Sequence, residues 1–186
     1  MQESKDLIEK QKHSEKVFSG KLLHVYYDEV ILPDNTESSR EWIKHPGASA
    51  VVPIFSNGDV LLVSQYRYPS KQIFLEVPAG KIDKGEDPHQ TAERELKEET
   101  GATAKELYYI GHFFPAIGYA NEVIHIYAAL DLTFDEENTD ADEFVEKKRI
   151  PFKQAIEMVH SGDINDGKTI CCLLRAERFL KEQGKI

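Results

Sequence analysis

Acidic side chains recur at a helical spacing in the middle of the chain. Residues 80–102 read GKIDKGEDPHQTAERELKEETGA. Asp87 followed by proline is typical of a helix start, Gln90 completes a capping box, and Gly101 can end the helix in the left-handed conformation. At about 100° per residue, one face of this helix carries three carboxylates, those of Glu95, Glu98 and Glu99. Such like charges repel each other unless a cation binds there.

The ligand type indicates which cation this face could bind. Oxygen ligands alone favour a hard cation such as Mg²⁺, or Mn²⁺ in its place, over zinc. The alternative is a solvated acidic face, which is the usual state of charged runs on helices. The helix by itself leaves both interpretations open.

The wider spacing resembles the Nudix box. Gly80 is followed after five residues by Glu86, and after seven more by Arg94-Glu95-Leu96; then, at intervals of one residue, come Glu98-Glu99 and Gly101, with Ala102 at the final aliphatic position. An accidental match of seven fixed identities is very improbable in a short chain. The resemblance implies a hydrolase of nucleoside diphosphates linked to another group. It also implies an α/β/α sandwich with a mixed sheet.

The resemblance also implies roles by position. Glu95, Glu99 and the Ala79 carbonyl correspond to metal ligands, and Glu98 corresponds to a ligand or an acid–base helper. Arg94 corresponds to the residue that orients these acids. Metal ions held there would bridge the diphosphate oxygens and lower the pKa of a water molecule, which makes a nucleophile available near neutral pH.

The chain before the box is rich in short strands. Residues 17–45 carry this pattern, and the charged residues 1–16 are expected to be a helix or a loose arm. The segment resembles the lead region of the ADP-ribose pyrophosphatase branch, which implies exchange between two subunits of a homodimer. We therefore expect a dimerisation region over 1–45 and a Nudix domain over 46–186. Trp42 is either a base-stacking residue or a half-buried strand residue.

The remaining pattern predicts the main sheet and two helices. Apolar runs over 48–55 and 60–66 flank an Asn-Gly turn, and a third strand over 72–78 delivers Ala79, with Glu76 on the opposite face from Val77. Two further strands follow the box. Helices are expected from Pro151 and from Lys168.

Further candidates for substrate binding lie outside the box. Arg67 follows the second strand of the sheet, and its fork of donors suits a phosphate, although a surface ion pair is the alternative. Glu122 ends a Gly-Tyr-Ala-x-Glu stretch that matches the ADP-ribose enzymes. Asp166 and Lys168 form an Asp-x-Lys that resembles the nucleoside diphosphate sugar hydrolases, or else a helix cap followed by a solvent lysine.

An acidic segment over 131–146 reads as a mobile loop. In related enzymes the corresponding loop brings a glutamate into the site as the base or as an additional metal ligand. Glu143 fits that position best, and Glu146 is the second choice.

These features predict hydrolysis of nucleoside diphosphate sugars such as ADP-ribose, ADP-glucose and GDP-mannose to a nucleoside monophosphate and a sugar 1-phosphate. The alternative is a dedicated ADP-ribose pyrophosphatase that forms AMP and ribose 5-phosphate. Ile117 argues against it, because it stands where that branch has a marker proline. A non-catalytic nucleotide sensor is a remote third possibility, since every acid of the box is present.

Composition limits the partners and the compartment. The 186 residues carry a net charge of −10, which disfavours nucleic acid and requires local cations for a diphosphate substrate. No apolar run is long enough for a membrane helix, and the first residues are unlike a signal peptide, so a cytoplasmic enzyme is expected. The two cysteines, Cys171 and Cys172, are adjacent and indicate small core residues rather than a disulfide framework.

Overall fold

The computed structural model describes residues 7–134 and 145–185. It divides into two compact units, residues 1–46 with 116–122 and residues 47–115 with 123–186.

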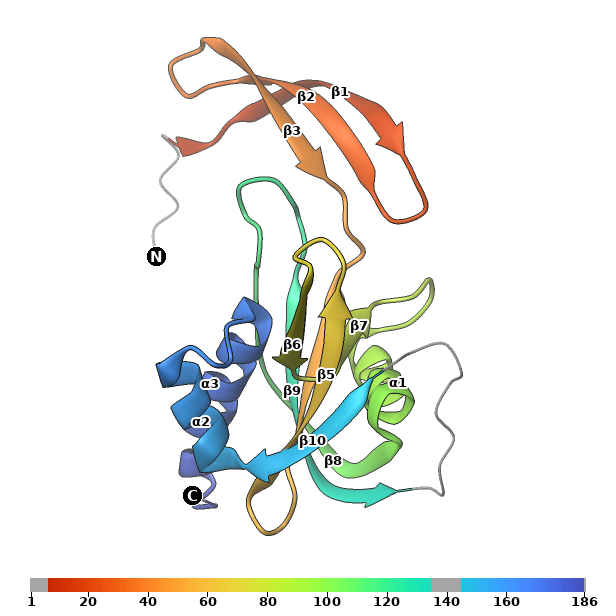
Figure 1. Cartoon of the computed structure of the whole chain (residues 1–186). Helices are drawn as coiled ribbons and strands as arrows, with labels where there is room; N and C mark the ends of the chain where they lie inside the picture. The colour runs from red at the N-terminus through yellow and green to blue at the C-terminus, as the bar shows by residue number, and fades with distance from the viewer. Residues whose placement is uncertain (1–6, 135–144, 186) are drawn as a thin grey trace. The chain divides into compact units, whose positions relative to one another are not determined.

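The first unit is an antiparallel sheet of three strands, drawn in red to orange in Figure 1. Its strands are β1 (Lys10–Ser19), β2 (His24–Ile31) and β3 (Glu37–Ile43), with β2 in the middle. All ten residues of β1 are exposed, which explains why its charged sequence gave no strand signal. The expectation of a helix or loose arm before residue 17 is therefore wrong over β1. Pairing with β2, rather than an apolar pattern, holds this segment extended.

The second unit contains two sheets. One has the order β10-β5-β6, and the other has the order β7-β4-β9-β8 with β4 and β9 parallel and the outer pairs antiparallel. The strands of the second unit are β4 (Ala48–Pro53), β5 (Asp59–Arg67), β6 (Gln72–Glu76), β7 (Ala79–Lys81), β8 (Ala102–Phe113), β9 (Ile124–Phe134) and β10 (Glu146–Pro151). The sequence prediction of a mixed sheet is confirmed. The acidic segment predicted as a loop is strand at both of its described ends, in β9 and β10.

The Asn-Gly turn forms, but it does not join two paired strands. Gly58 donates to the Phe55 carbonyl, and β4 and β5 meet at a single bridge between Ile54 and Val60. Every residue of β4 is buried, so its ladder bonds go to β7 and β9 within the four-stranded sheet. The turn therefore connects the two sheets.

Helices cover the sheets on both sides, with α1 on one side and α2 and α3 on the other (Figure 1). Ala92 and Leu96 of α1 (Pro88–Thr100) pack against Val51 and Tyr127 of the four-stranded sheet. Helices α2 (Phe152–Ser161) and α3 (Gly167–Glu182) pack on the sheets from the other side, and the larger hydrophobic core lies between these helices and the strands. The second unit is therefore an α/β/α sandwich.

The ends of α1 follow the sequence prediction closely. Asp87 and Gln90 form a reciprocal capping box, and Gly101 ends the helix at φ 72°, a conformation that suits glycine. These caps fix which turn of the helix carries the acids.

None of the described helices has the length and apolar content needed to cross a membrane.

Candidate active site

The short strand β7 lies directly against the acidic face of α1. A Cβ atom on Gly80 would stand 1.8 Å from Glu95 Oε1, so only glycine lets the backbone approach this carboxylate so closely. The Ala79 amide donates to Glu99 Oε2 at 3.3 Å. Glu95 and Glu99 are only 8% and 7% exposed. The predicted metal-binding residues are thus brought together around β7.

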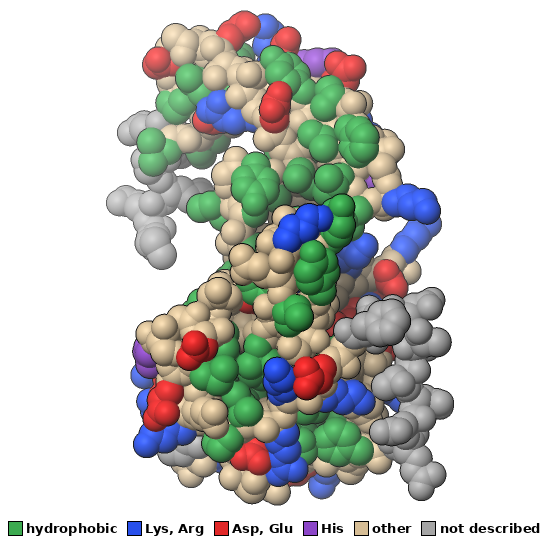
Figure 2. Space-filling model, viewed as in Figure 1, with side chains coloured by type: hydrophobic (Ala, Val, Ile, Leu, Met, Phe, Trp, Pro, Cys, Tyr) green, Lys and Arg blue, Asp and Glu red, His purple; other side chains and the backbone are tan. Residues whose placement is uncertain are grey.

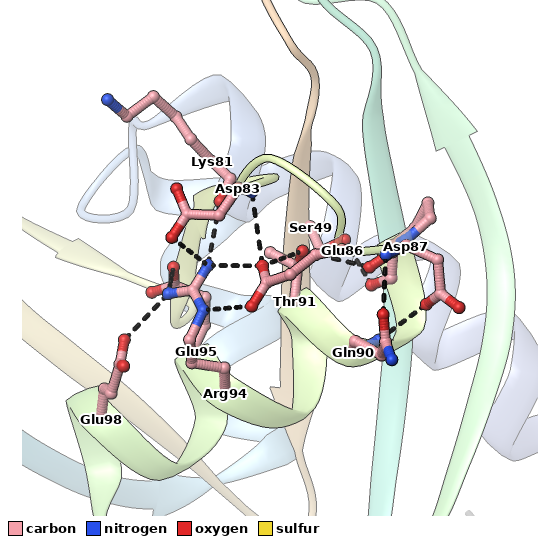
Figure 3. Close-up of polar contacts among 11 residues, drawn as sticks. Ser49, Lys81, Asp83, Glu86, Asp87, Gln90, Thr91, Arg94, Glu95 and Glu98 are labelled. Carbon is pink, nitrogen blue, oxygen red and sulfur yellow. Dashed lines mark hydrogen bonds and ion pairs between the residues drawn. The ribbon is translucent and has the colours of Figure 1, made fainter.

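Arg94 lies at the centre of the acidic residues (Figure 3). Its Nε and Nη2 donate to the two oxygens of Glu86, and its second Nη2 hydrogen goes to the Lys81 carbonyl. Its Nη1 donates to Glu95 Oε1 at 2.6 Å and to Glu98 Oε2 at 2.9 Å. A guanidinium has five N–H groups, so this one is fully used. Arg94 holds three acids of the box in one arrangement.

This network shifts the ionisation of its members. Hydrogen bonds from Arg94 and Thr91 lower the pKa of Glu86 to about 2. Hydrogen bonding to Glu86, followed by Glu98 and Glu95, raises the pKa of Arg94. Arg94 and Glu86 therefore stay charged across the range in which proteins work.

The possible metal-ligand atoms at β7 and α1 suit a hard divalent cation. They are two buried carboxylates, Glu95 and Glu99, and a backbone carbonyl, that of Ala79, all of them oxygen. Across the described ranges, 7–134 and 145–185, no group of three or more His, Cys, Asp or Glu side chains is spaced to hold a metal. Mg²⁺ is usually bound by one or two carboxylates and keeps water and substrate oxygens as its other ligands, which matches this partial set.

A second charged cluster surrounds the buried carboxylate of Glu76, which is 2% exposed. Arg67 donates Nε and Nη2 to its two oxygens at 2.7 Å each. Lys168 Nζ lies 3.1 Å from Glu76 Oε2 and 3.2 Å from Asp166 Oδ2. These four residues border a cavity of about 280 Å³ that Ser70 and Phe74 also line.

The start of α3 combines both interpretations of its Asp-x-Lys sequence. Asp166 accepts the backbone amides of Lys168 and Thr169, so it is a helix cap. Lys168 is not a solvent lysine, because its side chain is only 14% exposed. Burial and the opposing charge of Lys168 act on Asp166 in opposite directions, and its pKa ends below the ordinary value.

The other sequence candidates belong to other parts of the chain. Trp42 and Glu122 belong to the first unit: the Trp42 ring stacks on Tyr26 at 5.0 Å, and Glu122 Oε1 is 3.6 Å from His45 Nδ1. Glu143 lies outside the described residues. Glu146 begins β10, where it pairs in register with Ser64 and its side chain is 74% exposed.

Sequence reasoning assigned no role to Glu76. The available signal was weak, since an acid on the face of a strand opposite an apolar residue usually points to solvent. Only the fold reveals that this face is buried against Arg67 and α3. The cysteine prediction is confirmed for Cys172, which is buried, and burial raises its thiol pKa to about 12.

The fold, the box geometry and the family comparison agree. The family model described as NUDIX domain matches residues 44–171, so the chain belongs to the Nudix family.

Several relatives extend over nearly the whole chain. An ADP-ribose pyrophosphatase of Bacillus subtilis (strain 168) is 43% identical over 89% of this chain and 90% of its own length. A methanol dehydrogenase activator of Bacillus methanolicus is 37% identical over 94% and 97%. A GDP-mannose pyrophosphatase of Yersinia enterocolitica (serotype O:8 / biotype 1B, strain NCTC 13174 / 8081) is 32% identical over 83% and 87%.

A solved structure matches the fold. The crystal structure of an ADP compounds hydrolase superposes with a TM-score of 0.84 at 23% identity, covering 96% of this chain and 97% of that one. At this identity the match supports the fold alone, and it confirms the Nudix α/β prediction.

Proposed function

We propose that this chain is a divalent-metal-dependent pyrophosphohydrolase that cleaves nucleoside diphosphate sugars to a nucleoside monophosphate and a sugar phosphate. The observation that carries the proposal is the Arg94 network, which holds Glu86, Glu95 and Glu98 together beside β7. The names of two relatives, an ADP-ribose and a GDP-mannose pyrophosphatase, support this substrate class. A small-molecule substrate, with no nucleic acid, and a cytoplasmic location complete the proposal.

Each residue of the site has a distinct task in this proposal. Glu95, Glu99 and the Ala79 carbonyl would hold Mg²⁺ or Mn²⁺, and the bound cations would supply charge neutralisation for the diphosphate and activation of a water molecule. Arg94 orients Glu95 and Glu98 without contacting the substrate, since all its donors are used. Glu98 is exposed enough, at 43% of its side chain, to take or give a proton at the edge of the site.

Arg67 is the candidate for direct contact with a substrate phosphate. Its side chain is 44% exposed and lines the cavity beside Glu76. Arginine can pair two phosphate oxygens with parallel N–H groups, which a lysine cannot do.

The substrate class is tested by product analysis. ADP-ribose, ADP-glucose and GDP-mannose are incubated in parallel with the full chain and Mg²⁺, and phosphate-containing products are separated by ion exchange. We expect cleavage of the hexose substrates at rates comparable with or above that of ADP-ribose. Controls without metal should form no product. Absence of cleavage for all three substrates would contradict the proposed function.

The second candidate is a dedicated ADP-ribose pyrophosphatase. The B. subtilis relative of that name, at 43% identity, is the specific observation in its favour. Activity on ADP-ribose alone in the same experiment would select it. AMP and ribose 5-phosphate would then be the only products.

The base of the reaction is proposed to be Glu143, with Glu98 as second choice for the proton transfer and Glu146 as the alternative from the same segment. The exposed position of Glu146 on β10, where it lies 3.8 Å from Lys148 Nζ, gives it no partner in the Arg94 network. The rates of Glu143→Gln and Glu146→Gln, measured side by side at saturating substrate, decide between the two. A slow Glu146→Gln beside a normal Glu143→Gln would reverse the assignment.

Trp42 is proposed to stack on the nucleobase, and Glu122 is proposed to bind the substrate. Because Tyr26 covers one face of the Trp42 ring, stacking on a base would use the other face. Trp42→Ala should raise the KM for the best substrate and change kcat little. An unchanged KM would remove Trp42 from the site and leave it as a packing residue of β2 and β3.

The first unit is proposed to be a dimerisation region, with the domain boundaries at 1–45 and 46–186. Among its described residues Val30 is the one buried hydrophobic side chain, and exposed apolar side chains include Val17, Phe18, Leu22 and Leu23. Figure 2 shows apolar side chains on the surface of this sheet. A small sheet needs an apolar face covered to be stable.

The oligomeric state checks this part of the proposal. Light scattering after size exclusion should give twice the mass of the chain. Phe18→Glu should shift the protein to monomer, whereas Lys21→Glu, which removes no apolar surface, serves as the control. A monomeric wild-type chain would refute the dimer.

A further inference from the structure

Lys168, which the sequence assigns to the substrate, has no donor to spare in the structure. Its Nζ donates to the Val77 carbonyl at 3.2 Å and lies 3.1 Å from Glu76 Oε2 and 3.2 Å from Asp166 Oδ2. An ammonium has three N–H groups, so these three acceptors use all of them. The side chain is 14% exposed. A substrate phosphate could bind Lys168 only by displacing one of these buried acceptors.

Arg67 differs in this respect. Within the described ranges, its two hydrogen bonds both go to Glu76, which leaves three of its five N–H groups available. Its side chain is 44% exposed and lines the cavity of about 280 Å³. Arg67 is therefore the group of this cluster that can receive an anion.

We propose that Lys168 is a positioning residue: it acts on phosphate binding through Glu76 and Arg67 and does not contact the substrate. The proposal rests on the function proposed above and refines its binding site. It also replaces the direct substrate role that the sequence suggested for Lys168.

The physical argument starts at Glu76. Glu76 is only 2% exposed, so burying its charge costs a large desolvation free energy. Arg67 and Lys168, which contact its two oxygens, offset this cost together. If Lys168 were removed, Glu76 would rely on Arg67 alone. Arg67 would then be drawn toward the buried charge and its remaining N–H groups would turn from the cavity.

The position of Lys168 is itself fixed by α3. Asp166 accepts the Thr169 amide and hydroxyl at 2.9 and 2.7 Å and pairs with Lys168 Nζ. Thr169 Oγ1 also accepts the Val77 amide at 3.0 Å. The first turn of α3 thus connects Asp166, Lys168, Glu76 and Arg67 in a single chain of charges with alternating sign.

The same turn touches the backbone leading to the metal-binding residues. Val77 is bonded through both its amide and its carbonyl, two residues before Ala79. Lys168 could therefore act on the metal site rather than on Arg67. The two routes predict different readouts, because a displaced Ala79 carbonyl would shift the Mg²⁺ concentration for half-maximal rate, whereas a misplaced Arg67 would shift the KM of the substrate.

A double-mutant cycle tests the proposal. Wild type, Lys168→Met, Arg67→Ala and the double variant are compared by kcat and KM for ADP-ribose or whichever diphosphate the wild type cleaves. Lys168→Met should raise KM by about 10-fold, as loss of a supporting partner commonly does. In the Arg67→Ala background it should have no further effect. If the fold-changes in KM of the two single variants multiply in the double variant, Lys168 contacts the substrate independently of Arg67, and the proposal is overturned.

Three further measurements separate positioning from general damage. Lys168→Arg keeps the charge and should restore most of the KM. Arg149→Met removes a more exposed ion pair of the same unit, that of Arg149 on β10 with Asp59 on β5 at 2.8 Å, and should leave KM unchanged. The half-maximal Mg²⁺ concentration should stay the same in Lys168→Met. A shift in it without a shift in KM would assign Lys168 to the metal site and reject the proposal.

The positioning role of Lys168 can be tested even if the proposed function is wrong. Should the wild type cleave no diphosphate sugar, the same four proteins are titrated with ADP by calorimetry without metal. Loss of affinity in Lys168→Met that disappears in the Arg67→Ala background would support the positioning role. Equal ADP affinity of all four proteins would refute it.

Discussion

Two arginines of the second unit sit among acids in opposite ways. Arg94 faces more negative groups than it can neutralise and uses all five N–H groups on Glu86, Glu95, Glu98 and a carbonyl. Arg67 belongs to a balanced cluster of two cations and two carboxylates and uses two N–H groups, both on Glu76. The first arginine has no donor left for a ligand, whereas the second keeps three N–H groups that bond to none of the residues the structure describes.

This difference indicates where charge is left for the substrate and the metal. Around Arg94 there are three carboxylates for one guanidinium, so the excess negative charge would attract the proposed divalent ion. Around Arg67 the charges cancel, so the proposed diphosphate would be recognised there by oriented N–H groups rather than by net charge. Figure 2 shows that the second unit intersperses acidic and basic side chains elsewhere on the face in view. Local arrangement, not the overall charge of −10, decides what binds.

The largest effect is expected where the excess of acid is removed. Glu99 is only 7% exposed and accepts a hydrogen bond from the Ala79 amide. Glu99→Gln removes its negative charge and keeps the shape of the side chain. Loss of a supporting partner of a metal site costs about 10- to 100-fold, so loss of a ligand should cost on the order of 10³-fold in kcat. The rate is measured at saturating Mg²⁺, with circular dichroism to verify the fold. Near-normal turnover would contradict the metal assignment.

In the balanced cluster, loss of Glu76 should act mainly on stability. Glu76→Ala leaves Arg67 and the mostly buried Lys168 without their shared partner, which should cost about 3 kcal/mol of the free energy of unfolding. The control Asp59→Ala breaks the exposed pair with Arg149 and should cost about 1 kcal/mol or less. Urea denaturation measures both. Equal losses would mean that burial does not separate these pairs.

A conservative change at the first arginine sharpens the comparison. Arg94→Lys keeps the charge but loses the fork that reaches Glu86, Glu95 and Glu98 at once. Activity or Mg²⁺ affinity should fall about 10- to 100-fold. The matched change Arg67→Lys should instead raise the KM of the substrate at an unchanged Mg²⁺ requirement. Identical profiles for the two variants would remove the distinction between orienting and binding.

The sequence revealed the first of these clusters as a group. Of the second it singled out Arg67, Asp166 and Lys168, but neither Glu76 nor the contacts that join them. Gly80, Glu86, Arg94 and the three glutamates lie within one helix and its approach, so spacing alone brings them together. Caps at Asp87 and Gly101 fixed the helix limits, and both were predicted. Short-range order of this kind can be read from residue types.

The second cluster depends on contacts between distant parts of the chain. Glu76 and Lys168 are 92 residues apart in the sequence, and they come into contact because α3 packs against β6. Strand β1 was missed for a related reason, since its ten exposed residues are extended only because β2 pairs with them. Strand pairing and buried charge are properties of the tertiary fold, and neither leaves a periodic signal in one sequence.

The smallest predicted effect concerns the pH dependence of the Arg94 network. Hydrogen bonds from Arg94 and Thr91 lower the pKa of Glu86 from about 4.5 to about 2 in the folded chain. A carboxyl whose folded pKa is depressed stabilises the fold above its unfolded pKa, and this stabilisation is lost as the pH falls through the folded value. The melting temperature of wild type should therefore exceed that of Glu86→Gln above about pH 4.5 and converge with it by about pH 2.

Comparison of two variants isolates this effect from general acid unfolding. Most other carboxylates titrate equally in wild type and in Glu86→Gln, so they cancel in the difference between the melting curves. Glu157→Gln, at an exposed site on α2, gives the baseline for removing one acid. A difference for Glu86→Gln that persists unchanged to pH 2 would mean that shape, rather than the ion pair with Arg94, makes Glu86 stabilising. The network would then be held by Glu95 and Glu98, and the excess of acid around Arg94 would be smaller than proposed.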